Sequence, residues 1–369
     1  MWEGSIHTWL VQVLRHIDRS RFCLDFVVHT NREGYYHAEV RSLGAKIMPC
    51  LNYYQPWWYQ QNLQRILKEN GPYDIIHTHI ADYSGWVMRV AYKAGVPIRI
   101  PHSHNNPSHF PGNSQLYWRF RLMVMRRWLR KYSTHFLAVS QDALAMFGAD
   151  RVKHRRYYIL NAPPIFQAYH EKVDSAALRN SLHIPPEAPV IGHVGRFCDA
   201  KNHFLILEIA KEMAKNLPQA RFLLIGDGPL RSAVEAKAHA LGLGDQVIFA
   251  GFRKDVPRLL LGALDLFLFP SLYEGLGLAL VEAQAAGLPC VYSDIIPKEA
   301  DVVPLLLHRL SLNSSIPAWA DAIRAALNNP HAISQQEALR MVEKKFNIVE
   351  NVKELERIYT IALNEAKLR

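Results

Sequence analysis

The chain has 369 residues, which favours two domains of ordinary size over a single one. Hydrophobic residues make up 49% of it and charged residues 21%; this balance is typical of a globular protein and excludes disordered, collagen-like and disulfide-stapled chains. The net charge of +10 lies in the first part, where residues 1–170 hold 21 basic and 10 acidic side chains. Such a basic region attracts an anionic partner: nucleic acid, an acidic membrane or a phosphorylated substrate.

Features that would direct the chain out of the cytoplasm are not found in the sequence. No run of 18 apolar residues is present, and polar residues interrupt the start where a signal peptide would be apolar. The four cysteines are scattered, without the paired spacing of a zinc site or a disulfide framework. We therefore expect a cytoplasmic protein.

The first part alternates helical and strand-like segments, which predicts a parallel α/β sheet. A helix is expected at 6–17, followed by strands at 22–28, 73–79, 97–101, 134–140 and 157–160, with helices such as 59–70 and 83–94 between them. A Rossmann-like domain begins with a strand, whereas this chain opens on Gly4 and a helix. Either the true start lies upstream, or the domain lacks its central strand and has an open groove in its sheet.

A basic segment at 117–131 predicts a helix in which arginines alternate with aromatic and aliphatic residues. Arg126, Arg127 and Arg130 are candidates for contact with anionic lipid headgroups, because arginine and tryptophan are frequent at that interface. The alternative is a core-packed helix with a solvated basic face. No zinc-finger, RNA-binding or heptad-linked motif accompanies the charge, so nucleic acid is not expected as the partner.

A proline-containing loop at 161–164 and polar sequence up to 189 predict the domain boundary. We assign residues 1–165 to the first domain, 166–345 to the second, and 346–369 to a helix that packs back on the first. The second domain is expected to have strands at 190–194, 222–225, 247–250, 266–269 and 290–293, with helices such as 204–216, 230–241 and 279–286.

The segment SLYEGLGLALVEA, residues 271–283, follows a predicted strand and enters a helix near Gly277. Free backbone N–H groups at a helix start form an anion or hydroxyl site. Glu274 and Glu282 are eight residues apart and could bind a polyhydroxylated ligand, since a carboxylate accepts several hydrogen bonds. The alternative is that neither residue binds a ligand: Glu274 would only stabilise the start of the helix, and Glu282 would be a solvated helical residue. The spacing alone fits both interpretations equally well.

Two cations follow another predicted strand in the second domain. Arg196 and Lys201 lie in GRFCDAKN, residues 195–202, at a strand end where ligands bind in open parallel sheets. They could neutralise a pyrophosphate and the charge of a departing nucleoside diphosphate.

Together these motifs resemble the retaining GT-B glycosyltransferases of the glycosyltransferase 4 family. The segment at 274–282 is similar to that family's E-x7-E signature, the segment at 195–202 to its G-R-x(3–4)-K-[GN] element, and GDGPL at 226–230 to its G-x-G-P-L turn. HSHN at 102–105 follows a predicted strand and is similar to the segment found there in the family's capsule- and exopolysaccharide-type members. The resemblance implies an α/β fold of two Rossmann-like, doubly wound parallel-sheet domains facing a cleft.

The resemblance also implies roles for individual residues. His102 and Glu274 would act at the donor sugar, with His104 as a weaker candidate on the acceptor side. His77 and His79 end the preceding predicted strand, and we expect them mainly to pack or to support neighbouring site residues. Glu282 would bind the ribose and Phe252 would border the base. The remaining implied donor-binding residues are Gly4, Arg196, Lys201, Gly228, Gly275, Leu276, Gly277 and Leu278. Two motifs depart from the family: the opening loop reads GSIH at 4–7, and the hinge reads NAPP at 161–164.

The expected function is transfer of a hexosyl group from a nucleotide sugar, a UDP-sugar by preference, to a saccharide or polyprenyl-diphosphate-linked acceptor. Retention of configuration, exopolysaccharide, capsule or envelope glycan synthesis, and peripheral attachment to the inner membrane face are further expectations. No cofactor and no metal are expected, since cationic side chains would replace Mg²⁺. The alternatives are a non-catalytic or truncated GT-B-like protein that binds sugar nucleotide without turnover, and a GT-B epimerase or phosphorylase.

Overall fold

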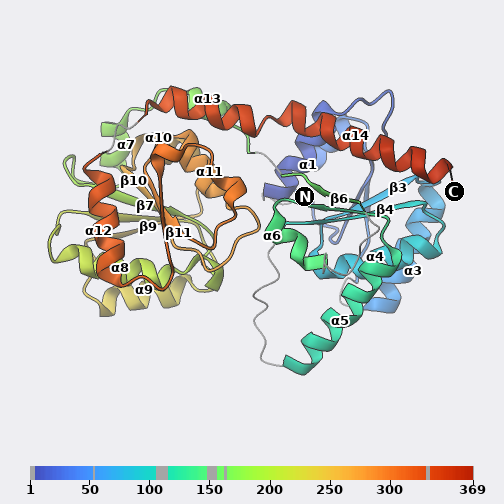
Figure 1. The fold of residues 1–369 in the computed structure, drawn as a ribbon, viewed down its shortest axis with the longest axis horizontal. Helices are drawn as coiled ribbons and strands as arrows, with labels where there is room; N and C mark the ends of the chain where they lie inside the picture. Colours follow the sequence, from blue (N-terminus) through green and yellow to red (C-terminus); the bar gives the residue numbers. More distant parts are fainter. Residues whose placement is uncertain are drawn as a thin grey trace. The chain divides into compact units, whose positions relative to one another are not determined.

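The computed structural model describes residues 5–52, 55–104, 115–147, 156–161, 164–329 and 333–368, leaving aside the side chains of 5 and 115–118. The chain forms two compact units (Figure 1). Unit 1 comprises Met1–Pro164 and Phe346–Arg369, and unit 2 comprises Ile165–Lys345. The first boundary lies one residue from the predicted one, and the last helix belongs to unit 1.

Unit 1 contains only parallel pairings among its described strands, which form two separate sheets. One pairs β1 (Phe26–Val28) with β2 (Ile47–Pro49); the other has the order β3 (Ile75–Thr78), β4 (Ile98–Ser103), β5 (His135–Ala138), β6 (Arg156–Ile159). Within the described residues no strand pairs with both β1 and β3. The absence of a central strand stays a prediction.

The helices of unit 1 occupy the connections and the chain end. They are α1 (Ser5–His16), α2 (His37–Ser42), α3 (Pro56–Asn70), α4 (Ser84–Lys93), α5 (Gln115–Tyr132), α6 (Gln141–Leu144) and α14 (Ile348–Lys367). A shared core joins α1 and α14 to the sheet: Trp9 and Ile358 pack with Ile98 and Ile100 of β4. These alternate strand positions share one face, because side chains of a strand have a period of two.

Unit 2 is one six-stranded parallel sheet in the order β12-β11-β10-β7-β8-β9. Its strands are β7 (Val190–Val194), β8 (Arg221–Ile225), β9 (Val247–Gly251), β10 (Leu266–Phe269), β11 (Cys290–Ser293) and β12 (Leu307–Leu310). Its helices are α7 (Ser175–Ser181), α8 (His203–Ala214), α9 (Arg231–Ala240), α10 (Val256–Gly262), α11 (Leu278–Ala285), α12 (Ile316–Leu327) and α13 (Gln335–Lys345).

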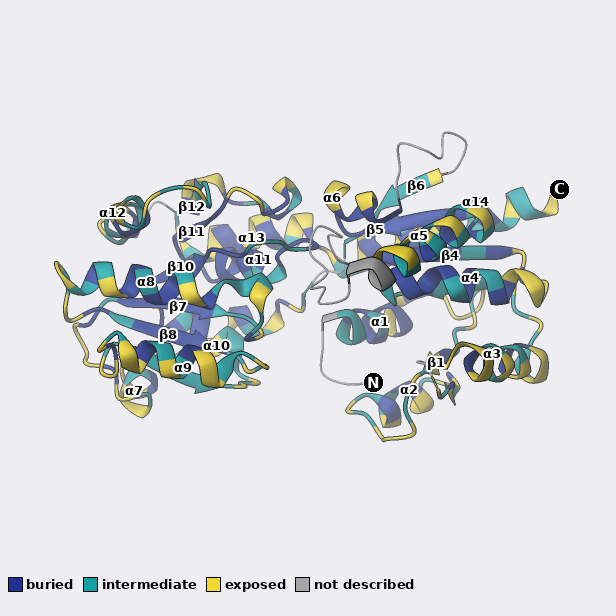
Figure 2. Ribbon diagram, turned by 90° about the horizontal axis from the view of Figure 1, so that it is seen from below, coloured by how far each residue is buried: buried dark blue, intermediate teal, exposed yellow. Residues whose placement is uncertain are grey.

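Both faces of the unit 2 sheet are covered. Side chains of α8, α9 and α12 form one core with β7, β8, β10 and β11, and α10 and α11 lie on the opposite side of the strands (Figure 1). The central strands β7, β8, β10 and β11 are accordingly almost wholly buried (Figure 2), whereas the edge strands β9 and β12 are mostly half-buried. The strand order reverses between β7 and β10, and in open parallel sheets this switch point is where ligands bind, beyond the carboxyl ends of the strands.

Among the described residues, no helix combines the length and the apolar composition that crossing a membrane requires.

Candidate functional site

The end of β7 leads into the first loop of the candidate site. A single 3-10 turn, Asp199–Lys201, follows, and Asn202 in the left-handed region (φ 53°) caps α8. A Cβ on Gly195 would lie 3.0 Å from Cγ and Cδ of Lys201, so glycine there leaves room for the lysine stem. Arg196 is exposed beside it. Both predicted cations therefore lie beyond the carboxyl end of β7.

The end of β10 leads into the second loop. Gly277 (φ 91°) caps α11 in a conformation that favours glycine. The backbone N–H groups of Leu276, Gly277 and Leu278 have no partner in the described part of the chain. As at other helix starts, unpaired N–H groups and the helix dipole favour an anionic group at this point.

An ion pair joins the two loops. Lys201 Nζ donates to Glu274 Oε1 over 2.6 Å, and both side chains are largely shielded, with 17% and 13% exposed. The same Nζ lies 4.7 Å from the centre of the Phe269 ring, and Leu272 N donates to Ala200 O. Sequence order separates these residues by about 70 positions, but the switch point between β7 and β10 brings them together.

Glu282 lies in the second turn of α11 and is half-buried. Its carboxylate has no hydrogen-bond or ion-pair partner among the described residues. Burial raises its pKa from 4.5 to about 7, and the Lys201 charge acts in the opposite direction. A carboxylate that lacks a protein partner retains its full capacity to accept hydrogen bonds from a ligand.

The third loop, GDGPL, follows β8 and is fixed against the first. A Cβ on Gly226 (φ 141°) would lie 2.0 Å from Gly195 O, and one on Gly228 would lie 2.5 Å from Phe197 O. Gly228 thus permits close backbone packing. Phe252, just beyond β9, is 60% exposed; the neighbouring Arg253 is held by Asp255 at 2.6 and 2.7 Å.

The predicted histidines lie in unit 1. His102, near the end of β4, is 1% exposed and donates from Nε2 to Leu160 O over 2.9 Å. His104 Nε2 lies 2.9 Å from His79 Nδ1. The two histidines are thus brought together with each other and with His77 and His79. Gly4, the predicted phosphate-side residue, lies outside the described residues.

The basic helix α5 packs on α4 through one face. Met125 O lies 2.3 Å from the position of a Cβ on Gly85, and the Trp128 ring centroid lies 5.0 Å from that of Trp86, with the two rings tilted by 57°. Arg127 is exposed, and Arg126 and Arg130 are half-buried. The outward face also carries Arg119 and two exposed apolar side chains, Phe120 and Met123.

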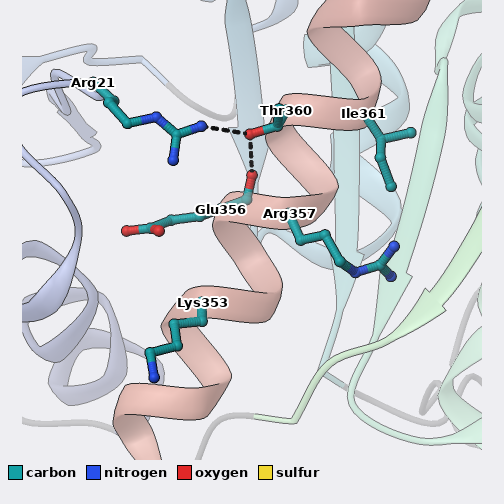
Figure 3. A pocket seen from close by; sticks show the side chains of 6 residues that line it. All are labelled: Arg21, Lys353, Glu356, Arg357, Thr360 and Ile361. Carbon is teal, nitrogen blue, oxygen red and sulfur yellow. Dashed lines mark hydrogen bonds between the residues drawn. The ribbon is translucent and has the colours of Figure 1, made fainter.

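A surface hollow of about 300 Å³ on unit 1 contains none of the predicted site residues (Figure 3). It is lined by Arg21, Lys353, Glu356, Arg357, Thr360 and Ile361. Two of its cations are paired along α14: Lys353 with Glu350 and Arg357 with Glu354. Figure 3 shows that Arg21 donates to Thr360 Oγ1.

Sequence reasoning missed the residues beneath the loops. Phe269 lies under Lys201 Nζ, and His193 in β7 donates to Leu268 O while its Nε2 faces the loop at Gly195. From the sequence alone, both are ordinary members of a buried strand. The aromatic ending of the strand at 266–269 was the available signal, but it is indistinguishable from core packing without the register of β7 and β10.

The fold and site define a class: a two-unit protein of parallel α/β sheets whose second unit gathers cations and unpaired N–H groups at its switch point. Two family models match the chain, Glycosyltransferase Family 4 over residues 7–161 and Glycosyl transferases group 1 over residues 174–347. EpsF of Bacillus subtilis (strain 168), named as a glycosyltransferase, is 32% identical over 98% of this chain and 94% of its own length. The chain belongs to the glycosyltransferase 4 family.

Solved structures show the same fold, GT-B. HepE of Anabaena in complex with UDP-glucose is similar with a TM-score of 0.77 and 20% identity, covering 97% of this chain and 96% of its own. Sucrose-phosphate synthase of Thermosynechococcus elongatus also has a TM-score of 0.77, with 18% identity over 98% and 94% of the two chains. A further relative, the Escherichia coli UDP-Gal:alpha-D-GlcNAc-diphosphoundecaprenol alpha-1,3-galactosyltransferase, is 26% identical over 81% of this chain and 78% of its own.

Proposed function

We propose that this glycosyltransferase moves a hexosyl group from a UDP-sugar to a saccharide or a polyprenyl-diphosphate-linked saccharide, in the synthesis of an exopolysaccharide, capsule or other envelope glycan. The observation that carries the proposal is the junction of Lys201 and Glu274, flanked by Arg196 and the free N–H groups of α11. The cations and the helix start suit a diphosphate, and the carboxylates suit the hydroxyl groups of a sugar joined to it.

The donor would lie along the switch point of unit 2. Arg196 and Lys201 would neutralise the diphosphate, and Glu282 would accept hydrogen bonds from the ribose. Glu274 and the backbone at 275–278 would hold the sugar. Gly228 would permit close approach of the nucleotide, and the exposed Phe252 ring would border the base. The UDP and UDP-glucose bound to HepE support uracil as the base.

Transfer would proceed with retention and without a covalent intermediate. Lys201 holds Glu274, so this carboxylate is poorly disposed to attack the anomeric carbon. In a front-side reaction the bond from that carbon to the phosphate oxygen breaks, the bond to the acceptor oxygen forms, and the acceptor proton passes to the departing phosphate. The two cations stabilise the charge of that leaving group without a metal ion. His102 and His104 remain candidates for contact with the sugar and the acceptor.

The acceptor would meet the basic unit 1. The Escherichia coli relative is named for an acceptor linked to diphosphoundecaprenol, a lipid anion. An attractive potential on unit 1 and the exposed arginines and apolar side chains of α5 suit such an acceptor at an anionic membrane surface. We infer a peripheral position on the inner membrane face.

A transfer assay tests this function. The chain is incubated with UDP-glucose, UDP-galactose or UDP-N-acetylglucosamine and a synthetic polyprenyl-diphosphate-linked N-acetylglucosamine. We expect UDP release that depends on the acceptor, an α-linked product by NMR, and a loss of about 100-fold or more for Arg196→Ala. Arg258→Ala, an exposed arginine of the same unit, is the matched control.

A non-catalytic relative is the second candidate, and the separation of the β1–β2 sheet from the β3–β6 sheet favours it. It predicts that UDP binds and that no UDP-sugar in the panel is turned over with any lipid-linked acceptor. UDP-sugar consumption without an acceptor would instead indicate an epimerase or hydrolase.

A further inference from the structure

A buried tyrosine of unit 2 has a hydroxyl group that the fold itself does not use. Tyr169 lies in the 3-10 turn Gln167–His170, near the start of unit 2, and is 2% exposed. Its hydroxyl oxygen is buried and has no hydrogen-bond partner among the described residues. Buried polar groups are normally paired, because a donor that leaves water without gaining a partner costs free energy. The position of this hydroxyl therefore needs an explanation.

The turn that carries Tyr169 is fastened to α11. The side-chain amide of Gln335, at the start of α13, donates to Tyr169 O and to Ala285 O, each over 3.1 Å. This amide is itself held in place by close packing, since a Cβ on Gly287 would lie 2.9 Å from Gln335 Cα. Ala285 lies less than one helical turn beyond Glu282. The backbone of Tyr169 is thus fixed beside the part of α11 that carries Glu282.

The phenol of Tyr169 and the carboxyl of Glu282 are within electrostatic reach of each other. Burial raises the pKa of Tyr169, and the negative charge of Glu282 raises it further. The Glu282 carboxyl also lacks a hydrogen-bond or ion-pair partner among the described residues, and the charged group that acts on it is Lys201. A phenol donates one hydrogen bond and a carboxylate accepts several. The two buried groups that lack a partner are therefore complementary.

Rotation of the Glu282 side chain would join the two groups. A glutamate side chain turns about three bonds, and no hydrogen bond in the described structure holds this carboxyl, whereas the Tyr169 ring is enclosed by its neighbours. The carboxyl is thus the group that turns. Once one of its oxygens accepts a hydrogen bond from Tyr169, the other has a fixed direction and keeps its lone pairs for a ligand.

We propose that Tyr169 is a positioning residue of the donor site: its hydroxyl donates to one carboxylate oxygen of Glu282 when the nucleotide binds, and the other oxygen then accepts hydrogen bonds from the ribose. This inference rests on the proposed function, in which Glu282 binds the ribose of a UDP-sugar. Because Tyr169 orients a ribose contact and not the reacting atoms, its loss should weaken donor binding and leave the transfer step unchanged.

A double-mutant cycle on UDP binding tests the coupling. The full chain is titrated with UDP in the presence of EDTA as the wild type, Tyr169→Phe, Glu282→Ala and the double variant. We expect Tyr169→Phe to weaken UDP binding about tenfold when Glu282 is present, since a hydrogen bond to a charged group is lost, and less than about twofold in the Glu282→Ala background. A tyrosine with a merely structural role would weaken binding by the same factor in both backgrounds.

Kinetics and stability give two further readouts. With the UDP-sugar that the wild type uses, Tyr169→Phe should raise KM about tenfold and leave kcat within about twofold. Without ligand, this variant should melt at the wild-type temperature or higher, because the hydroxyl that it removes has no partner.

Tyr292→Phe is the matched control. Tyr292 is a buried tyrosine of the same unit, and its hydroxyl donates to Asp301 Oδ1 over 2.8 Å. Loss of that bond should lower the melting temperature, while the affinity for UDP stays unchanged. Circular dichroism checks that every variant is folded.

The outcomes separate this inference from the proposed function. A wild-type chain that binds UDP, with a Tyr169→Phe variant that binds it equally tightly or loses the same factor with and without Glu282, would overturn the inference and leave the function standing. A lower melting temperature for ligand-free Tyr169→Phe would show that the hydroxyl is already paired, and would also overturn it. A folded wild-type chain that binds no UDP would overturn both.

Discussion

Two carboxylates of one short segment occupy opposite electrostatic surroundings. Glu274 is neutralised by Lys201 at 2.6 Å, whereas Glu282 has no partner and carries a pKa of about 7. Eight residues of sequence separate them, and the difference arises from the fold: the loop of Glu274 meets the β7 loop, while Glu282 lies on α11. The two residues should therefore respond oppositely to removal of their charge.

We predict that Glu282→Gln stabilises the ligand-free chain at high pH. The pKa of its carboxyl is about 7 in the folded chain and 4.5 at its usual value, so the folded chain binds the proton more tightly than the unfolded chain. The stability that this proton contributes is fully present below pH 4.5 and is lost as pH rises through about 7. Melting temperatures of the variant and the wild type should agree near pH 4.5, and the variant should melt a few degrees higher at pH 8.

Glu274→Gln is the matched control for that prediction. It breaks the pair with Lys201 and should cost about 2 kcal/mol of stability at pH 8. A wild-type chain that melts at the same temperature as Glu282→Gln at pH 8 would show that the Glu282 carboxyl is not penalised by burial.

At the scale of elements, α5 divides its surface between core and solvent. Met125 and Leu129 are buried, Arg121 bonds Asp82 at 2.9 Å, and the guanidinium of Arg89 lies over Trp128. Sequence reasoning associated tryptophan with the membrane interface, but Trp128 packs on α4. Arg119, Phe120, Met123 and Arg127 are what the helix presents outward.

We predict that Arg119→Glu combined with Arg127→Glu weakens binding to vesicles of phosphatidylglycerol and phosphatidylcholine at least tenfold. Each basic residue near an anionic surface contributes about 1 kcal/mol, and charge reversal adds repulsion. Co-sedimentation at low and physiological salt provides the measurement. Lys172→Glu with Lys298→Glu, on unit 2, changes the net charge equally; similar losses for both pairs would show that overall charge, not α5, determines binding.

At the scale of the molecule, the sequence was sufficient for the α/β architecture and for most strands. Short apolar runs predicted β7, β8 and β10 within a residue of their bounds, because parallel strands are apolar on both faces. It did not predict β2 or β12, which are short and only half-buried. The site loops after β7 and β10 were predicted because glycine and charge follow each strand.

The side-chain contacts depended on the register of the strands. Nothing in the linear sequence shows that His79 lies beside His102, so His77 and His79 could only be expected to be packing residues. Nor does it show that Tyr359, 282 positions from His77, forms a hydrogen bond with the His77 ring. Likewise, the partner of Lys201 could not be chosen between Glu274 and Glu282 before the strand order was known. Contacts of this kind arise from topology rather than from local pattern.

Calorimetric titration with UDP, GDP and ADP in the presence of EDTA tests the central claim that the unit 2 switch point binds the donor nucleotide without a metal. We predict that UDP binds most tightly, that Arg196→Ala and Glu282→Ala weaken it at least tenfold, and that Arg258→Ala does not. A folded wild-type chain that binds none of the three nucleotides, or variants of Arg196 and Glu282 that bind UDP as tightly as the wild type, would contradict the account.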